Sequence, residues 1–538
     1  MRVLAIIPAC EGSVTLPNKN VRVIQGKPMI YYVIDNAKRS KYITDVIVTS
    51  NSNEIIALAR QMRVMTRHRR AELSNATVSL DEVVWDVFEQ LDIADYDYIV
   101  TMQSISPLLK VDTLDRAFER FIKEGLDSLI SVKNQSQFFW EMSENVPIPL
   151  QKERMNRHQL PPFYMETGAF LITKSQFITK KTRLGPKVGI FELTGDEAID
   201  VNNFADLELV ENAMSRKSAA IYVNGNNKIG LGHISRVFQV ADELFTKPDI
   251  YYDDAITDRG SFGKTTYNVI PVNGDDGFVR EMTRSDYDII INDVLDTSEK
   301  FMKELRAGKP FSRIINFEDS GTGAEYADIV INALYEQERV GNIYSGSNYY
   351  IIPKMFLLYD PITIRDRVEN VIITFGGADP RNFTEYALKV ASEDRFRNVR
   401  FYIVLGKANK NKEAIINESQ GFENVKIMVD IDNIAEIMSY CDIAISSRGR
   451  TCFELAALGI PTLSIAQHER EELHTFVSEK NGFMCLPSAV DEEMVKKSIK
   501  EIIDSPKDIR FKMQEKMLAN DLRNGRKNVA GIIQNNNR

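Results

Sequence analysis

Cysteine, histidine and tryptophan are scarce in this chain of 538 residues, which has four, five and two of them, respectively. The cysteines are far apart and form neither a metal-ligand spacing nor a disulfide framework. We therefore expect a cytoplasmic protein whose reduced thiols pack as small core residues. The four cysteines are Cys10, Cys441, Cys452 and Cys485.

Long apolar runs and an excess of positive charge are also lacking. The N-terminal run at residues 3–7 is too short for a signal peptide or a membrane segment, so we expect no membrane partner. The chain has 67 basic and 76 acidic residues, a net charge of −9, which argues against a general nucleic-acid binder. Any phosphate must then be held by local sites.

The first part of the chain alternates apolar segments with amphipathic ones. Residues 2–7, 45–49 and 98–102 are predicted to be buried strands separated by helices, which indicates an α/β domain with a parallel, doubly wound sheet. Ligands should lie at the carboxyl ends of the strands, among loops 8–20 and 103–109. Helices are also predicted at 28–38, 80–91 and 203–215, a strand at 163–173 and an insertion at 142–163.

A second α/β unit begins after residue 218, with a strand, a glycine turn and a helix. Gly230 and Gly232 let the backbone approach a ligand closely, and the helix N-terminus offers free N–H groups to a phosphate. The chain therefore looks like two enzymes joined near residue 218. The predicted parts are a domain at 1–217 and two lobes at 218–362 and 363–538, with strands at 219–223, 288–292, 328–332, 370–375 and 441–446 and a helix at 451–458.

Residues 7–20 resemble the signature loop of the CMP-sialic acid synthetases, the acylneuraminate cytidylyltransferases. Further matching motifs follow in order at 69–79, 103–109, 159–170 and 200–211. The resemblance covers essentially all of residues 1–215. It implies a Rossmann-like nucleotidyltransferase domain that joins CTP to a nonulosonic acid, releases pyrophosphate and uses Mg²⁺ held by carboxylates.

The same resemblance assigns site residues, but the sequence departs from the family pattern where charge matters. The family's two arginines, lysine and second metal aspartate are replaced here. Losing one preorganised transition-state donor typically costs ~10²–10³ in rate, so an active cytidylyltransferase and a non-catalytic nucleotide-binding domain both stay open. The departures are Cys10, Val14, Leu109 and Asn202. The implied residues are Ser13, Lys19, Asn20, Arg69 and Ser79 for CTP, Gln103, Tyr164 and Glu166 for the sugar, and Asp200 for the metal.

Residues 220–480 resemble the UDP-sugar hydrolase of the pseudaminic acid pathway, a relative of the two-lobed, GT-B-like glycosyltransferases. The family releases UDP and the free sugar, and its mechanism needs no metal or other cofactor. The resemblance implies a pair of Rossmann-like lobes with a UDP-sugar as the substrate. The matching motifs lie at 230–236, 292–293, 349–356, 375–380 and 451–461.

The hydrolase resemblance makes His233 the general base and Asp293 the group that orients the base or the substrate. A helix-capping role for His233 and a simple Asn-Asp turn at Asp293 are the structural alternatives. Glu454 is expected to bind the ribose hydroxyls, although the helix dipole alone would favour an acid there. The expected UDP-binding residues are Gly230, Gly232, Gly376, Gly377, Thr451 and Glu454.

This chain has Arg448-Gly449-Arg450 where the family has Gly-Gly-Ser. The two arginines either clamp a diphosphate bidentately or obstruct it, and the sequence leaves both readings open. The family's Asn-Gln pair near the next strand is also replaced, by residues 467–470. The reaction class is thus better defined than the substrate.

These resemblances meet in one pathway and predict a bifunctional enzyme of nonulosonic acid biosynthesis. The alternative is a glycosyltransferase in the C-terminal half that acts on an acceptor, joined to a degenerate N-terminal nucleotide-binding domain. The expected partners are CTP, a nonulosonic acid and a UDP-sugar, and the assembly considered is a homodimer through the N-terminal domain. The sugar, the oligomeric state and the glycan destination stay open.

Overall fold

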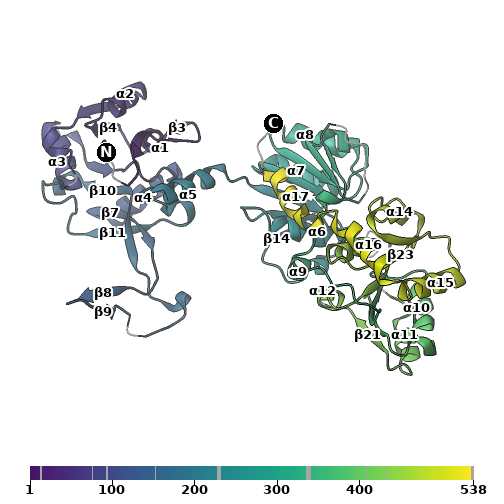
Figure 1. Ribbon diagram of the computed structural model, residues 1–538. Helices are drawn as coiled ribbons and strands as arrows, with labels where there is room; N and C mark the ends of the chain where they lie inside the picture. The colour runs from purple at the N-terminus through teal and green to yellow at the C-terminus, as the bar shows by residue number, and fades with distance from the viewer. Residues whose placement is uncertain are drawn as a thin grey trace. The chain divides into compact units, whose positions relative to one another are not determined.

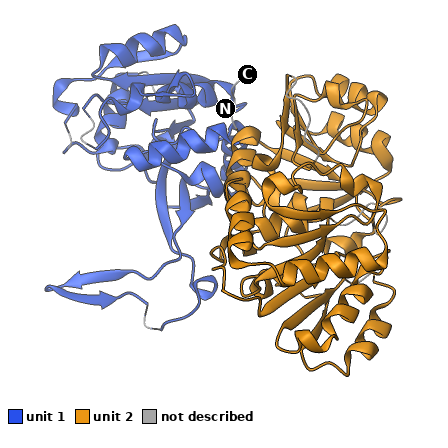
Figure 2. Ribbon diagram, turned by 45° about the vertical axis from the view of Figure 1, so that its right-hand side comes forward, with its two compact units in different colours: residues 1–216 blue, residues 217–538 orange. Residues whose placement is uncertain are grey.

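Two compact units make up the chain, Met1–Arg216 and Lys217–Arg538 (Figure 2). The computed structural model describes residues 1–12, 15–75, 77–91, 95–151, 153–226, 232–334, 341–406, 409–431 and 433–534. Both units are α/β structures, which confirms the predicted fold class (Figure 1). Within the described ranges, none of the helices combines the length and the hydropathy that crossing a bilayer requires.

Unit 1 contains a seven-stranded sheet covered by helices on both faces. Side chains alternate across β1: Val3 and Ala5 pack in one core with α1 and α4, whereas Leu4 and Ile6 pack in another with α3. The strand order is β11 (Val188–Glu192), β7 (Ser128–Asn134), β10 (Tyr164–Lys174), β6 (Tyr98–Thr101), β1 (Val3–Pro8), β4 (Asp45–Ser50) and β5 (Met65–His68). The helices are α1 (Met29–Arg39), α2 (Asn53–Gln61), α3 (Leu80–Gln90), α4 (Val111–Glu124) and α5 (Phe204–Ser215).

One strand of the unit 1 sheet runs against its neighbours. β10 is antiparallel to both β6 and β7, so the prediction of a wholly parallel sheet is wrong for this domain. Parallel neighbours need a crossover connection, usually a helix, and the described segment between β7 and β10 contains instead the hairpin of β8 (Trp140–Ser143) and β9 (Val146–Pro149). The apolar pattern predicted the strand but not its direction.

The first lobe of unit 2 is a fully parallel sheet of seven strands. Its order reverses between β12 and β15, and such a reversal opens a crevice at the carboxyl ends of the two strands. The strand order is β14 (Asn268–Val272), β13 (Asp249–Asp253), β12 (Ala219–Val223), β15 (Ile289–Asp293), β16 (Arg313–Phe317), β17 (Ile329–Asn332) and β18 (Ile343–Ser345). The helices are α6 (Gly232–Ala241), α7 (Gly274–Arg284), α8 (Glu299–Gly308) and α9 (Lys354–Leu357).

The second lobe repeats this plan with six parallel strands, and its order reverses between β19 and β22. The expected pair of Rossmann-like lobes is therefore confirmed. The strand order is β21 (Val425–Val429), β20 (Arg400–Leu405), β19 (Asn370–Thr374), β22 (Ile443–Ser447), β23 (Thr462–Ile465) and β24 (Phe483–Leu486). The helices are α10 (Phe383–Ala391), α11 (Lys412–Ser419), α12 (Ile434–Met438), α13 (Thr451–Ala457), α14 (Glu469–Glu472), α15 (Glu492–Ile503) and α16 (Lys507–Leu518).

The last helix, α17 (Gly525–Gln534), crosses back to the first lobe. Its Val529 and Ile533 join the apolar core beneath β12 and β15. Its buried Arg526 forms an ion pair of 2.5 Å with Glu243. The sequence did not indicate this crossing, and the lobe boundary at residue 362 stays a prediction.

Candidate active sites

His233 and Asp293 meet at the point where the strand order of the first lobe reverses. Asp293 ends β15, and His233 is the second residue of α6, which follows β12. His233 Nδ1 lies 2.5 Å from Asp293 Oδ1, and the two residues are 5% and 0% exposed. A carboxylate only accepts hydrogen bonds, so in the neutral ring Nδ1–H donates and Nε2 keeps its lone pair. The ring therefore binds a carboxylate instead of capping a helix.

Arg236, which lies one turn along α6, completes this buried network. Its Nε donates to Asp293 Oδ2 at 2.8 Å, one terminal nitrogen donates to Oδ1 at 2.6 Å, and the other reaches Glu318 at 3.3 Å. Burial alone would raise the pKa of the Asp293 carboxyl, but Arg236 and His233 hold that pKa well below its usual range. Neither Arg236 nor Glu318 was predicted as a site residue from the sequence, although Arg236 lies within the matched 230–236 motif.

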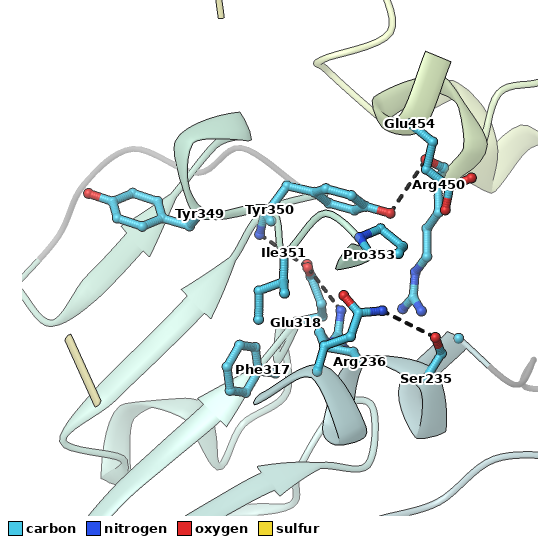
Figure 3. A pocket seen from close by; sticks show the side chains of 13 residues that line it. Ser235, Arg236, Phe317, Glu318, Tyr349, Tyr350, Ile351, Pro353, Arg450 and Glu454 are labelled. Carbon is cyan, nitrogen blue, oxygen red and sulfur yellow. Dashed lines mark hydrogen bonds and ion pairs between the residues drawn. The ribbon is translucent and has the colours of Figure 1, made fainter. Parts of the chain in front are cut away.

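A pocket of about 160 Å³ lies beside this network and receives side chains from both lobes (Figure 3). Its floor is one face of α6, and residues after β22 close it from the second lobe. Its charged residues are Arg236, Glu318, Arg450 and Glu454, and it is otherwise lined by Gly232, Ser235, Gln239, Phe317, Ala333, Tyr349, Tyr350, Ile351 and Pro353.

The expected UDP-binding residues are divided between this pocket and the loop edge of the second lobe. Gly232 and Glu454 line the pocket, and Thr451 begins α13 next to it. Burial raises the pKa of Glu454 to about 7. Gly376 and Gly377 follow β19 and do not line the pocket, whereas Gly230 lies outside the described residues.

The glycine turn after β19 is held by a third glycine that the sequence analysis missed. Gly376 has a φ of +73°, a left-handed conformation that favours glycine. A Cβ on Gly406 would lie 2.5 Å from the oxygen of Gly376 and from the Cα of Gly377. The turn therefore requires glycine on both sides of a close backbone contact. This is a structural reason for Gly376, and it is compatible with a ligand that binds next to the turn.

The sequence left open whether Arg448 and Arg450 clamp or obstruct a diphosphate. In the structure their side chains point to different places. A terminal nitrogen of Arg448 donates to the carbonyl of His474 at 3.4 Å. His474 Nδ1 in turn lies 2.7 Å from the carbonyl of Arg448. Only Arg450 reaches the pocket, as Figure 3 shows.

In unit 1, three of the expected CTP ligands gather around Cys10, just after β1. Asn20 donates to the Cys10 carbonyl at 2.6 Å and accepts a hydrogen bond from Ser104. Arg69 is 6% exposed, donates to the Thr49 carbonyl at 2.9 Å, and its Nε has no hydrogen-bond partner among the described residues. Burial lowers the pKa of Arg69, and the nearby Cys10 offsets part of this shift.

Lys19 belongs to the same group, and Ser13 lies outside the described residues. Burial lowers the pKa of Lys19, while Cys10 and Asp200 raise it. The loop after β1 therefore brings Lys19 close to both Cys10 and Asp200, the expected metal ligand.

Asp200 is held by neutral donors. It accepts hydrogen bonds from Ser106 Oγ and, at 3.1 Å, from the backbone N–H of Gly168, and burial raises the pKa of its carboxyl. Across the described ranges, no group of three or more His, Cys, Asp and Glu side chains is placed to hold a metal ion. Mg²⁺ is often bound through one or two carboxylates and substrate phosphates. A single protein carboxylate therefore fits a Mg²⁺ ion whose other ligands come mainly from a triphosphate.

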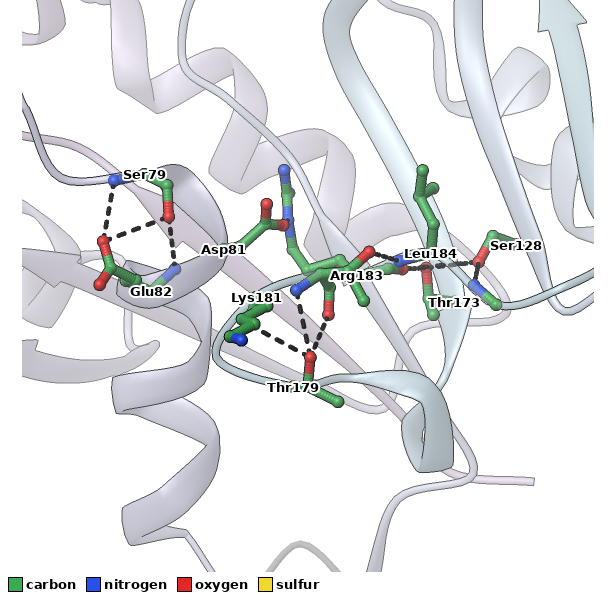
Figure 4. Close-up of polar contacts among 11 residues, drawn as sticks. Ser79, Asp81, Glu82, Ser128, Thr173, Thr179, Lys181, Arg183 and Leu184 are labelled. Atoms are coloured by element: carbon green, nitrogen blue, oxygen red, sulfur yellow. Dashed lines mark hydrogen bonds and ion pairs between the residues drawn. The ribbon is translucent and has the colours of Figure 1, made fainter.

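Ser79 has a structural role as the N-cap of α3 (Figure 4). Its hydroxyl accepts a hydrogen bond from Glu82 N at 3.2 Å, and the Glu82 carboxylate accepts one from Ser79 N at 3.2 Å. This capping box explains the serine without a ligand, so its contact with CTP stays a prediction.

The expected sugar ligands lie near one another through β10. Tyr164 and Glu166 are exposed and, two residues apart, share one face of the strand. Gln103 N donates to the Gly168 carbonyl at 2.9 Å. A Cβ on Gly168 would lie 2.6 Å from Ile105 and 3.3 Å from Gln103, so this glycine lets the 103–106 segment pack on β10. A glycine inside a predicted strand is the signal that the sequence analysis overlooked.

Family comparisons agree with this division of the chain. Residues 4–198 match the cytidylyltransferase family, and residues 370–529 match the glycosyltransferase family 28 C-terminal domain. Two segments of the chain are therefore similar to two different families, one of cytidylyltransferases and one of glycosyltransferases. The two resemblances inferred from the motifs are thereby confirmed.

Three relatives show how these domains occur elsewhere. The "Pseudaminic acid cytidylyltransferase and UDP-2,4-diacetamido-2,4,6-trideoxy-beta-L-altropyranose hydrolase" of Helicobacter pylori is 22% identical over 86% of this chain and 88% of its own length. The pseudaminic acid cytidylyltransferase of Campylobacter jejuni is 29% identical over 39% of this chain and 95% of its own. An uncharacterized protein of Methanocaldococcus jannaschii is 29% identical over 46% of this chain, but the match spans only 56% of that relative.

Proposed function

We propose that the chain is a bifunctional enzyme of nonulosonic acid biosynthesis. Unit 1 makes a CMP-sugar from CTP and a nonulosonic acid, and unit 2 hydrolyses a UDP-sugar to UDP and the free sugar. The buried contact between His233 and Asp293 is the observation that carries the second activity. The Helicobacter pylori relative, which is named for both activities and aligns with 86% of this chain, supports the pairing.

In the proposed hydrolysis, His233 acts as the general base. Its Nε2 takes a proton from water while the water oxygen bonds to the sugar, and the bond between the sugar and UDP breaks. Asp293 fixes the ring through Nδ1–H and stabilises the imidazolium that forms. Arg236 keeps Asp293 ionised and in place. We propose that this reaction requires no metal.

In the proposed transfer reaction, Lys19 and Arg69 compensate the charge of the CTP triphosphate, while Asn20 positions the loop after β1. We propose that Asp200 supplies the protein ligand of Mg²⁺. When bound, the ion neutralises part of the triphosphate charge. Pyrophosphate release is therefore expected to stop in EDTA and to return with magnesium, whereas UDP release should be unaffected. An EDTA-sensitive hydrolysis that magnesium restores would contradict the metal-free assignment.

A second candidate for unit 2 is transfer of the sugar to an acceptor, because residues 370–529 match a glycosyltransferase family. Incubating the full chain with a panel of UDP-sugars and no acceptor separates the two. We expect stoichiometric release of UDP and free sugar. Release that begins only when an acceptor is added would assign a transferase.

The alternative for unit 1 is a domain that binds nucleotide without turnover. It is favoured by Cys10, Leu109 and Asn202, which replace charged residues of the family. Measuring pyrophosphate release from CTP with a panel of nonulosonic acids decides between the two. We expect release with at least one of these sugars, and CTP binding without release would assign the non-catalytic domain.

We also propose that unit 1 forms a homodimer through its β8–β9 hairpin. Trp140 and Met142, which share one face of this hairpin, are 54% and 65% exposed, an apolar pair that is unusual on a monomer surface. Light scattering on the full chain is expected to give a dimer that the double substitution Trp140→Glu, Met142→Glu converts to a monomer. A monomeric wild-type chain would contradict this.

The free cysteines are consistent with a reducing compartment, and we propose a cytoplasmic location. Cys10 is exposed, so a thiol reagent added to fresh cell extract should label it without prior reduction. Labelling that needs a reductant would count against this location.

A further inference from the structure

Arg450 brings a positive charge from the second lobe to the first. It lies between β22 and α13, and its side chain reaches the start of α6, as Figure 3 shows. Its guanidinium packs so closely on Gly232 that a Cβ at that position would collide with Arg450 Nη1. What approaches the backbone of Gly232 in this structure is therefore a side chain of the other lobe.

The charge of Arg450 is poorly compensated. Asp293 and Glu318, the nearest acidic groups of the first lobe, are ion-paired with Arg236. No ion pair joins Arg450 to a carboxylate in the part of the chain that the structure describes. Burial lowers the pKa of Arg450, and Arg236 lowers it further. A desolvated guanidinium without a counter-ion is unfavourable, so this end of the pocket favours an anion.

Glu454 does not supply the missing charge. It lines the same pocket on the first turn of α13, but burial raises the pKa of its carboxyl to about 7, and Arg450 offsets only part of that rise. The Tyr350 hydroxyl donates to the Arg450 carbonyl at 3.4 Å. The guanidinium is thus left directed into the pocket.

We propose that Arg450 binds the diphosphate of the UDP-sugar and thereby joins the two lobes across the pocket. This inference rests on the proposed hydrolysis of a UDP-sugar, whose diphosphate is the anion that Arg450 would meet. A guanidinium matches phosphate oxygens with two parallel N–H donors. Of the two readings that the sequence left open, Arg450 therefore clamps the substrate, whereas Arg448 is turned toward His474 and takes no part.

Binding of uridine, UMP and UDP to Arg450→Ser tests this, because the three ligands differ in their phosphates. Isothermal titration of the full chain should show UDP binding weakened by about 10- to 100-fold, since one charge-assisted hydrogen-bonded pair is lost. Uridine affinity should not change, and UMP should lie between the two. Arg450→Lys keeps the charge without the fork and should restore part of the UDP affinity.

Gly232→Ala provides an independent route to the same contact. The added Cβ occupies the place of Arg450 Nη1 and displaces the guanidinium. It should weaken UDP binding, and the double variant should bind no worse than Arg450→Ser, because both changes act through one contact. Arg397→Ser is the matched control, since Arg397 carries the same charge and is 78% exposed in the same lobe.

Four results would overturn the inference. Equal weakening of UDP and uridine would make Arg450 a structural residue, and tighter UDP binding by Arg450→Ser would make it an obstruction. Unchanged UDP binding by Arg450→Ser would show that Arg450 does not bind the diphosphate, while leaving the proposed function intact. A wild-type chain that binds none of the three ligands would instead refute the proposed function, and this inference with it.

Discussion

The candidate sites of the two units differ in how their charged groups are compensated. In unit 2, Arg236 pairs with Asp293 and Glu318, and Asp293 also holds His233, so each of these four side chains has a protein partner without a ligand. In unit 1, Lys19 and Arg69 both lie near Cys10. The Nε of Arg69 has no hydrogen-bond partner among the described residues. Asp200 is held only by a hydroxyl and a backbone N–H.

The difference indicates that the two sites depend on their ligands to different degrees. The proposed catalytic network of unit 2 is preorganised by its own ion pairs, so we expect the loss of a member to affect stability as well as turnover. Lys19 and Arg69 form no ion pair among the described residues of unit 1, so losing either should mainly affect nucleotide binding. Arg450 is the exception in unit 2, because its charge resembles the uncompensated cations of unit 1.

The largest expected effect is on turnover in unit 2. His233→Asn keeps a polar side chain but removes the base, and general base catalysis is typically worth ~10²–10⁴-fold. UDP release should fall by that factor, while UDP affinity measured by titration changes little. A stable variant with near-normal hydrolysis would remove His233 from the mechanism and weaken the contrast between the sites.

The next effect is on the stability of unit 2. Arg236→Met leaves Asp293 and Glu318 buried without their counter-ion, and breaking a buried ion pair in this way costs about 3–5 kcal/mol. Urea unfolding should show that loss in the C-terminal transition only. The control Arg397→Met breaks an exposed pair with Asp394 and should cost about 0–1 kcal/mol. Equal losses in both variants would show that the network is not preorganised by Arg236.

A smaller effect concerns pH and Glu454. Because burial raises the pKa of this carboxyl from 4.5 to about 7, the folded protein holds a proton that the unfolded chain releases. The contribution of this carboxyl to the free energy of unfolding is therefore full below pH 4.5 and is lost as the pH rises through 7. As the pH rises from 5 to 8, the free energy of unfolding of Glu454→Gln should increase by about 1–2 kcal/mol relative to that of the wild type. A constant difference across that range would show that Glu454 titrates normally.

The smallest expected effect tests whether the two sites are independent. Separate expression of residues 1–216 and 217–538 should give two soluble pieces, because each side carries complete α/β units. The melting temperature of each piece should match its transition in the full chain. Aggregation of both pieces beside a soluble full chain would show that the units depend on each other.

Much of the fold was predictable because its signals are local. Apolar runs and helical periodicity located β1, β4, β6, β12, β15 and β19 and the helices α1, α3, α5, α6 and α13. The direction of β10 was not predictable, because a buried strand has the same pattern in either direction. The packing of α17 on the first lobe was also missed, since its apolar stripe does not specify which core it joins.

The sequence by itself determined the α/β class and the two family resemblances, and it pointed to His233 and Asp293 as candidates for the chemistry. These depend on neighbours in the chain and on short motifs. Only the tertiary structure joined Arg236 to Asp293 and to Glu318, which is 82 residues further along the chain, and placed Arg450 over Gly232. Contacts of this kind depend on strand order and lobe packing, which no local pattern encodes. For that reason the roles of the two arginines at 448 and 450 separated only in the folded chain.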